Sequence, residues 1–417
     1  MANVEAEEAT NPGSDQAESA DLIIGIPAAA DPEEVRRRAT KAVTELLARK
    51  PIRVLVAYPG NAPSDSQEVP ESELEDTVQF LEYVAPQGSA TGVTWLGLAN
   101  TYAVLLGIAQ RFGAKACTVL GADLATLDGE SIGLLTQPVL DQRAELVMPI
   151  YPPSKYESLL NSGILYPVTQ ALYGRRVKHP LAADFGVSTS MLEQLVQVPR
   201  SGTDGAGDGV IWPATQAVVS EKQIAQAHVH ARHAAQNDGL DLSTVLSHLV
   251  GSLYGDVERQ APLWQRLRGS QPVPILGSSG APADDGQPVD IRPMLDSFQL
   301  ASRNLQEVWS LILPPVTLLE LKRISRIPAE QFRIPDALWV RIIYDFALAY
   351  RLRTISRAHL LGALTPLYLG WVASYVLEVS SASTYAAEQR IEQLAKAFED
   401  GKPYLLSRWR WPDRFNP

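Results

Sequence analysis

The residue with the clearest chemical potential is an aspartate that follows an apolar run. Residues 116–122 read ACTVLGA, and Asp123 comes next. This pattern predicts a buried strand that presents a carboxylate at its carboxyl end. Carboxylate oxygens are preferred ligands of Mg²⁺ and Mn²⁺, so Asp123 could bind a divalent cation that neutralises a diphosphate. Because an aspartate after a strand is also a common helix cap, the pattern alone leaves both interpretations open.

Several widespread catalytic motifs are absent from the sequence. It contains no Gly-x-x-x-x-Gly-Lys-Ser/Thr phosphate loop, no Gly-x-Gly-x-x-Gly after the first apolar run, no Gly-x-Ser-x-Gly elbow and no His-Glu-x-x-His. The enzyme classes that depend on those motifs are therefore excluded.

Composition narrows the range of partners and compartments. The 417 residues include 36 Lys+Arg and 47 Asp+Glu, a formal net charge of −11, and 46% are hydrophobic. Such a chain is globular, and its acidic balance argues against nucleic acid as a partner. The single cysteine, Cys117, lies inside an apolar run, which predicts a small buried hydrophobe and favours a reducing, cytoplasmic compartment.

The elements that must position Asp123 alternate between strands and helices. Apolar runs predict strands over residues 22–26, 53–58, 116–120 and 145–150, and helical periodicity predicts helices over 33–49 and 96–112. This alternation indicates an α/β fold with a mainly parallel sheet and helices on both faces. Ligands of such sheets bind beyond the carboxyl ends of the strands.

The remaining segments divide the chain into four parts. We predict an acidic, disordered tail over residues 1–20, a nucleotide-binding domain over 21–276, a Gly- and Pro-rich linker over 277–290, and a C-terminal α-helical domain over 291–417. The uncharged stretch 360–377 is interpreted as a buried helix, so no integral membrane span is expected. Trp371, Tyr375, Trp409 and Trp411 are expected to be buried in this domain, with a homo-oligomer surface as the alternative.

A longer pattern resembles a known enzyme family. It covers residues 109–124, 135–140, 147–151, 155–156, 161, 164–177 and 179–188, and late segments at 366–370 and 402–409. The string YPVTQALYGRRV at residues 166–177 is its most specific part. The chain resembles the family-2-type glycosyltransferases related to mannosylglycerate synthase and glucosyl-3-phosphoglycerate synthase. The resemblance implies a GT-A fold, a nucleotide-sugar donor, a divalent cation and transfer with retention of configuration.

The resemblance also implies roles for individual residues on the donor side. Asp123 matches the last carboxylate of a metal-binding Asp-x-Asp motif, and His230 is the best counterpart of a late histidine ligand. Pro27 and Asp31 lie where the family contacts the nucleobase, and Asp65 could replace an aspartate of the second strand.

On the acceptor side, Asp184 matches the aspartate of a Gly-Gly-Asp turn. Lys155, Tyr156 and Asn161 fall in the family's acceptor loop, and these four residues are our predicted catalytic set. Arg175 and Arg176, with Lys178, could offer cations to an acceptor phosphate or carboxylate, although a solvated turn would look the same.

Departures from the family pattern leave two functions open. Gly121 replaces the first aspartate of Asp-x-Asp, Leu98 replaces a lysine, and Ala182-Ala183 replaces Gly-Gly. Our first hypothesis is a glycosyltransferase that moves a hexose from a nucleotide-diphosphate sugar to a small anionic acceptor, with Mg²⁺ or Mn²⁺ as cofactor. The alternative is a catalytically impaired paralogue that binds sugar nucleotides or regulates such an enzyme.

Overall fold

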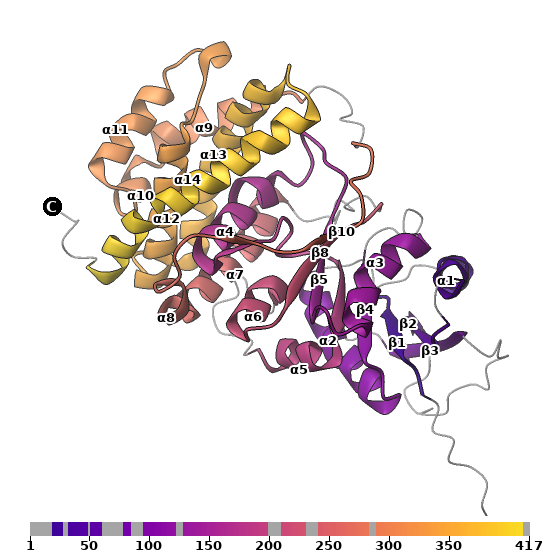
Figure 1. Ribbon diagram of the computed structural model, residues 1–417. Coiled ribbons are helices and arrows are strands. Elements are labelled where there is room, and N and C mark those ends of the chain that lie inside the picture. The colour runs from indigo at the N-terminus through magenta and orange to yellow at the C-terminus, as the bar shows by residue number, and fades with distance from the viewer. Residues whose placement is uncertain are drawn as a thin grey trace, which may run out of the picture.

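The computed structural model describes residues 19–27, 32–48, 51–60, 78–84, 95–121, 128–198, 210–230, 241–282 and 289–411. Within these ranges the chain forms an α/β sheet layer that is joined to a region made of helices (Figure 1). The structure thus shows the predicted fold class at the level of an α/β sheet with a C-terminal helical region.

The sheet has eight strands among the described residues, in the order β10-β8-β5-β7-β4-β1-β2-β3. The strands are β1 (Leu22–Gly25), β2 (Val54–Gly60), β3 (Val78–Val84), β4 (Ala116–Leu120), β5 (Leu146–Ile150), β7 (Asp184–Ser188), β8 (Ile224–His228) and β10 (Ile275–Leu276). Within this sheet the pairings of β7 with β4 and β5 are antiparallel, and the other pairings are parallel. The chain first extends the sheet from β1 towards β3 and then continues on the other side of β1 with β4, so a topological switch point lies between β1 and β4.

Helices cover both faces of the sheet. In Figure 1, α1 (Pro32–Leu47) and α3 (Gly129–Leu140) lie on one face, and α2 (Trp95–Arg111) and α5 (Thr189–Gln197) lie on the other. Every residue of β1, β4 and β5 is buried, which is why these strands read as continuous apolar runs. The strands predicted over 22–26, 53–58, 116–120 and 145–150 are confirmed, as is the burial of Cys117, which raises the pKa of its thiol to about 12.

Close packing of α3 on the sheet depends on Gly186 in β7. A Cβ atom at this position would lie 1.9 Å from the carbonyl oxygen of Leu135, so a larger residue would push the helix away.

The other helices and short strands lead from the sheet to the helical region. They are η1 (Asn161–Leu165), α4 (Tyr166–Tyr173), β6 (Arg175–Arg176), α6 (Pro213–Val219), α7 (Leu242–Arg259), α8 (Ala261–Trp264) and β9 (Gln271–Pro272). The C-terminal helices are α9 (Arg292–Asn304), α10 (Gln306–Ser310), α11 (Pro315–Ile324), η2 (Ala329–Gln331), α12 (Asp336–Leu352), α13 (Arg357–Val379) and α14 (Thr384–Arg410).

The described residues form two hydrophobic cores. The first surrounds the sheet, and the second is built by the C-terminal helices together with α4, α7 and α8. The second core therefore draws on sequence well before residue 277. The domain boundary over residues 277–290 stays a prediction. The second hydrophobic core contains residues from both sides of that boundary.

The apolar helix α13 is part of the second core. It is long and apolar enough to cross a membrane by composition, but 78% of its most hydrophobic window is buried inside the protein. Trp371, Tyr375 and Trp409 are also buried, as expected, while Trp411 is 58% exposed. These observations identify α13 as a core helix, in agreement with the prediction for residues 360–377.

Candidate functional site

The carboxyl ends of the parallel strands bring several of the predicted residues to one edge of the sheet. Pro27 follows β1 and is buried there, and Gly121 follows β4. Asp184 starts β7, and because β7 is antiparallel, its first residue pairs with Leu120, the last residue of β4. The antiparallel strand is thus what delivers Asp184 to the same edge.

Asp184 is fully buried and holds a tyrosine. The hydroxyl of Tyr151, just after β5, donates a hydrogen bond to Oδ2 of Asp184 at 2.6 Å. Burial, followed by the nearby Asp184 carboxylate, raises the pKa of Tyr151 well above its usual value, so the phenol is a neutral donor. The Tyr151 ring packs edge-on against the imidazole of His179, with ring centroids 4.9 Å apart. Asp184 therefore fixes the orientation of Tyr151 through this hydrogen bond, and Asp184 itself has no exposed surface.

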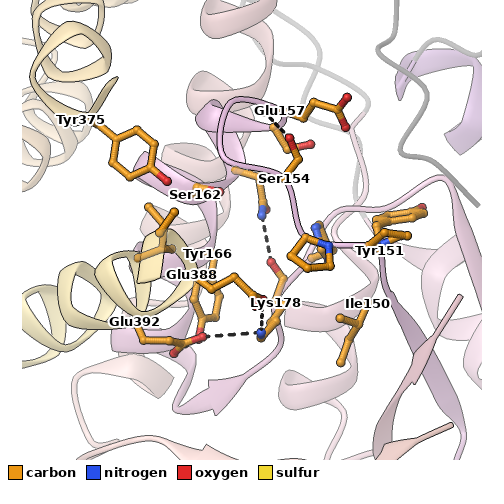
Figure 2. A pocket seen from close by; sticks show the side chains of 17 residues that line it. Ile150, Tyr151, Ser154, Glu157, Ser162, Tyr166, Lys178, Tyr375, Glu388 and Glu392 are labelled. Carbon is orange, nitrogen blue, oxygen red and sulfur yellow. Dashed lines mark hydrogen bonds and ion pairs between the residues drawn. The ribbon is translucent and has the colours of Figure 1, made fainter. Parts of the chain in front are cut away.

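Tyr151 forms part of the wall of a cavity of about 90 Å³ beyond the end of β5. The cavity lies between the loop 151–158, η1 and one face of α14 (Figure 2). Its described lining is Ile150, Tyr151, Pro152, Pro153, Ser154, Glu157, Ser158, Asn161, Ser162, Tyr166, Lys178, His179, Tyr375, Ala387, Glu388, Ile391 and Glu392. We call this space the strand-end cavity.

Lys178 is the central charge of the strand-end cavity. Its Nζ lies 3.0 Å from Oε1 of Glu388 and 4.0 Å from Oε1 of Glu392. Dashed lines in Figure 2 mark these ion pairs. The hydroxyl of Tyr166 donates to the other oxygen of Glu392 at 2.8 Å. Partial burial, and then the positive charge of Lys178, lowers the pKa of the nearby His228. The imidazole of His228 is therefore neutral at pH 7.

The backbone around Lys178 is fixed by two amide side chains. Nδ2 of Asn161 donates to the carbonyl oxygen of Lys178 at 2.9 Å, and the backbone N–H of Lys178 donates to Oε1 of Gln226 at 2.7 Å. Asn161 thus joins η1 to the segment that carries the cation. It is the one predicted catalytic residue that lines the strand-end cavity directly.

The other predicted acceptor-side residues lie around this cavity or outside it. Lys155 and Tyr156 belong to the loop that forms the cavity rim, where Nζ of Lys155 donates to the carbonyl of Ala382 at 3.4 Å and lies 5.4 Å from the Tyr156 ring centroid. Arg175 and Arg176 form the exposed strand β6, and Nε of Arg176 donates to Oγ of Ser270 at 3.1 Å. Neither arginine lines the strand-end cavity.

His230 forms a carboxylate–histidine pair at the same edge of the sheet. Its Nδ1 lies 2.7 Å from Oδ2 of Asp128, and its backbone N–H donates to Oγ of Ser131 at 3.0 Å. Burial raises the pKa of Asp128, but hydrogen bonds from the Ser131 backbone and from His230 outweigh this and lower it. Asp128 also caps α3, since its Oδ1 accepts from Ser131 N. This arrangement leaves Nε2 as the nitrogen of His230 that could bind a cation.

The remaining donor-side residues, Asp31, Asp65 and Asp123, lie outside the described residues. In the described part of the chain, no group of three or more His, Cys, Asp or Glu side chains is arranged to hold a metal ion. The predicted metal site of Asp123 and His230 therefore stays a prediction.

Sequence reasoning missed the wall that α14 contributes. Glu388 and Glu392 are one helical turn apart, and that spacing was a signal that both could face one ligand. Their contact with Lys178, some 210 residues earlier, had no signal in the sequence. Tyr151 lies within the segment that resembles the glycosyltransferase family. Its hydrogen bond to Asp184 could not be predicted, because it depends on β5 lying next to β7 in the sheet.

Comparison with models of known protein families and with curated proteins finds no match for this chain.

Proposed function

We propose that the chain is a retaining glycosyltransferase that moves a hexose from a nucleotide-diphosphate sugar to a small acceptor. The observation that carries the proposal is that one predicted acceptor-side residue lines a cavity and three others, from separate segments, lie behind its wall or in its rim loop. Asn161 lines the strand-end cavity, Asp184 holds its wall residue Tyr151, and Lys155 and Tyr156 belong to its rim loop. The cavity opens beyond strand ends, where ligands of parallel sheets bind.

In this proposal the acceptor occupies the strand-end cavity. Asn161 positions an acceptor hydroxyl, and Tyr151 is held in one orientation by its short hydrogen bond to Asp184. Because its one hydroxyl proton goes to Asp184, Tyr151 gives the acceptor a fixed, uncharged wall and has no further hydrogen bond to donate. α14 covers one side of the cavity and so limits the access of water to the transfer step.

The nucleotide sugar would bind at the switch point between β1 and β4, next to Pro27 and Asp123. The His230 side chain fits a role as a metal ligand, because Asp128 fixes its tautomer as carboxylates do for metal-binding histidines. Asp123 and His230 would hold Mg²⁺ or Mn²⁺, and the cation would neutralise charge on the leaving diphosphate.

Nucleotide binding and product formation test the proposal. We expect nucleoside diphosphates to raise the melting temperature more in the presence of Mn²⁺, and Asp123→Ala to abolish both this increment and sugar transfer. Asp296→Ala, on an exposed position of α9, is the matched control and should leave both unchanged. An active protein in which Asp123→Ala transfers sugar at the wild-type rate would contradict the site.

The competing function is a sugar-nucleotide-binding or regulatory paralogue without catalysis. Two observations favour it: Gly121 stands where the family has a metal-binding carboxylate, and the Asp128 carboxylate is already bonded to Ser131 and His230. It predicts stabilisation by nucleoside diphosphates that does not depend on metal, with no product formed.

A further inference from the structure

The charge of the strand-end cavity bears on what it can bind. Its described lining contains three carboxylates, Glu157, Glu388 and Glu392, and Lys178 as the only lysine or arginine. One cation against three carboxylates gives the lining a formal charge of −2, while Lys155 of the rim loop lies outside the lining with its Nζ on the carbonyl of Ala382. A phosphate or carboxylate ligand would therefore be repelled by the wall of the cavity.

The one cation is also not available to an anion. Its ammonium is already paired with Glu388 at 3.0 Å, with Glu392 at 4.0 Å. The neighbouring His228 does not add a second cation, because its pKa is lowered. Arg175 and Arg176 lie on β6 and do not line the cavity.

The cavity does not favour a cationic ligand either. Glu388 is engaged by Lys178, and Glu392 accepts a hydrogen bond from Tyr166. Glu157 and Glu392 are both exposed at the rim, where water screens their charge. Glu388 and Glu392 already have partners from the protein, and a ligand ammonium would have to displace them.

The uncharged groups of the wall instead call for a ligand that donates hydrogen bonds. Asn161 uses its Nδ2 on the Lys178 carbonyl, and its buried Oδ1 accepts no hydrogen bond within the described part of the chain. A buried amide oxygen without a donor is costly, and a ligand hydroxyl would relieve this cost. Tyr151, Tyr166 and Tyr375 line the same space and add aromatic surface for the C–H groups of a ligand.

We propose that the strand-end cavity binds a neutral polyhydroxylated molecule, a polyol or a free sugar, in place of the anionic acceptor that the sequence predicts. As an acceptor assignment this inference rests on the proposed glycosyltransferase function. The strand-end cavity has a volume of about 90 Å³, which would hold several waters and so suits a small polyol or part of a sugar ring.

The binding test does not require catalysis. Ligand-observed NMR on the full chain would compare glycerol and glucose with D-glycerate and glucosamine. We expect glycerol or glucose to bind, D-glycerate and glucosamine to bind at least tenfold more weakly, and Asn161→Ala to weaken polyol binding at least tenfold. Tighter binding of D-glycerate or of glucosamine than of both neutral compounds would overturn the proposal, as would polyol binding that Asn161→Ala leaves intact.

A charge variant keeps the test decisive if Asn161→Ala does not fold. Glu388→Gln with Glu392→Gln changes the formal charge of the cavity from −2 to zero and releases Lys178. We expect D-glycerate to bind the double variant at least tenfold more tightly than it binds the wild type, and glycerol to change less than threefold. Asp400→Asn, on the exposed side of the same helix, is the control and should change neither. Unchanged D-glycerate binding in the double variant would count against the assignment.

A separate measurement distinguishes this inference from the proposed function. Release of nucleoside diphosphate from a nucleotide-hexose reports donor turnover whether or not an acceptor binds. Polyol binding without donor turnover would contradict the proposed glycosyltransferase function and would support the polyol assignment of the cavity. Donor turnover that D-glycerate accelerates and no polyol accelerates would contradict the polyol assignment and would support the glycosyltransferase function.

Discussion

A carboxylate with no exposed surface needs hydrogen-bond donors from the protein, and Tyr151 is one of those that Asp184 has. Tyr151→Phe removes the hydroxyl that lies 2.6 Å from Oδ2 of Asp184 and leaves the ring in place. We expect the free energy of unfolding to fall by about 1–3 kcal/mol, because a buried acceptor loses a partner. Urea unfolding of the two proteins at pH 7 measures this difference.

Tyr385→Phe is the matched control for that substitution. Tyr385 is 68% exposed on α14, and its hydroxyl accepts from Gln389 at the surface. We expect a change below about 0.5 kcal/mol, as is usual for surface substitutions. Equal effects of the two substitutions would show that the hydroxyl of Tyr151 does not support Asp184.

We expect Asp345 to make the free energy of unfolding depend on pH. It is 1% exposed on α12, with Arg408 Nε at 3.0 Å and the Tyr404 hydroxyl at 2.9 Å. Burial outweighs these two partners and raises the pKa of Asp345 to about 7. Between about pH 4 and pH 7 the unfolded chain has lost this proton while the folded protein keeps it. The free energy of unfolding should therefore fall as pH rises through this window and level off above pH 7, with a slope of at most about 1.4 kcal/mol per pH unit from this group.

Urea unfolding at pH 5, 6, 7 and 8 measures this slope. Asp345→Asn removes the ionisable group, so the difference between wild type and variant should change across pH 5 to 7 and be constant above pH 7. A difference that is the same at all four pH values would show that Asp345 has no raised pKa.

At the scale of elements, the π-helical turn η1 fits closely against an aromatic stack. The carbonyl of Gly163 accepts from Trp339 Nε1 at 2.8 Å, and a Cβ atom at Gly163 would lie 2.4 Å from the Trp371 ring. Trp371 is itself stacked on Trp339 and on Tyr375, with centroids 5.7 and 5.5 Å apart. Gly163→Ala should therefore destabilise the fold by about 1–3 kcal/mol through overpacking.

Gly362→Ala in α13 is the matched control. A Cβ atom at Gly362 would meet nothing within 4 Å, so the substitution should stabilise the helix by about 0.5–1 kcal/mol. Thermal and urea unfolding measure both variants. The idea that η1 is held by contact with Trp371 fails if Gly163→Ala is as stable as Gly362→Ala.

The sequence predicts elements best where burial is continuous. The run at 116–120 matches β4 because both faces of that strand are covered, so every residue is apolar. The antiparallel direction of β7 is a property of its partners and leaves no local signal. The prediction of Asn161 as an acceptor-side residue agrees with its place in the lining of the strand-end cavity. Arg175 and Arg176 are exposed because β6 pairs with β9, and no local sequence signal indicates this pairing.

At the scale of the whole molecule, the candidate site lies where two cores meet. Tyr151 belongs to the core around the sheet, and Tyr375 belongs to the helical core, yet both line the strand-end cavity. The charge cluster also spans this junction, because Lys178 and Glu388 are 210 residues apart in sequence. The cavity therefore depends on correct packing of the whole chain, which explains why its α14 wall could not be predicted from sequence.

This shared packing predicts that the chain does not divide into two independently folding parts at the linker over residues 277–290. Every residue of α4 is buried, and α4 lies against α14 (Figure 1). The apolar face of α7, including Leu246, Leu249 and Leu253, is in the helical core as well. A fragment of residues 21–276 would expose these surfaces, and a fragment of residues 291–417 would lack the helices that cover its own apolar faces.

We therefore expect each fragment alone to be poorly soluble or to lack a cooperative thermal transition, because the apolar surface left exposed removes the main stabilising contribution of the second core. Co-expression of the two fragments is the control, since it keeps the packing of α4 and α7 against the C-terminal helices and removes only residues 1–20 and 277–290. The co-expressed pair should copurify and unfold in one transition by circular dichroism. Fragments that each unfold cooperatively within about 5 °C of the full chain, a shift of roughly 1–2 kcal/mol, would show instead that the two cores are energetically separate.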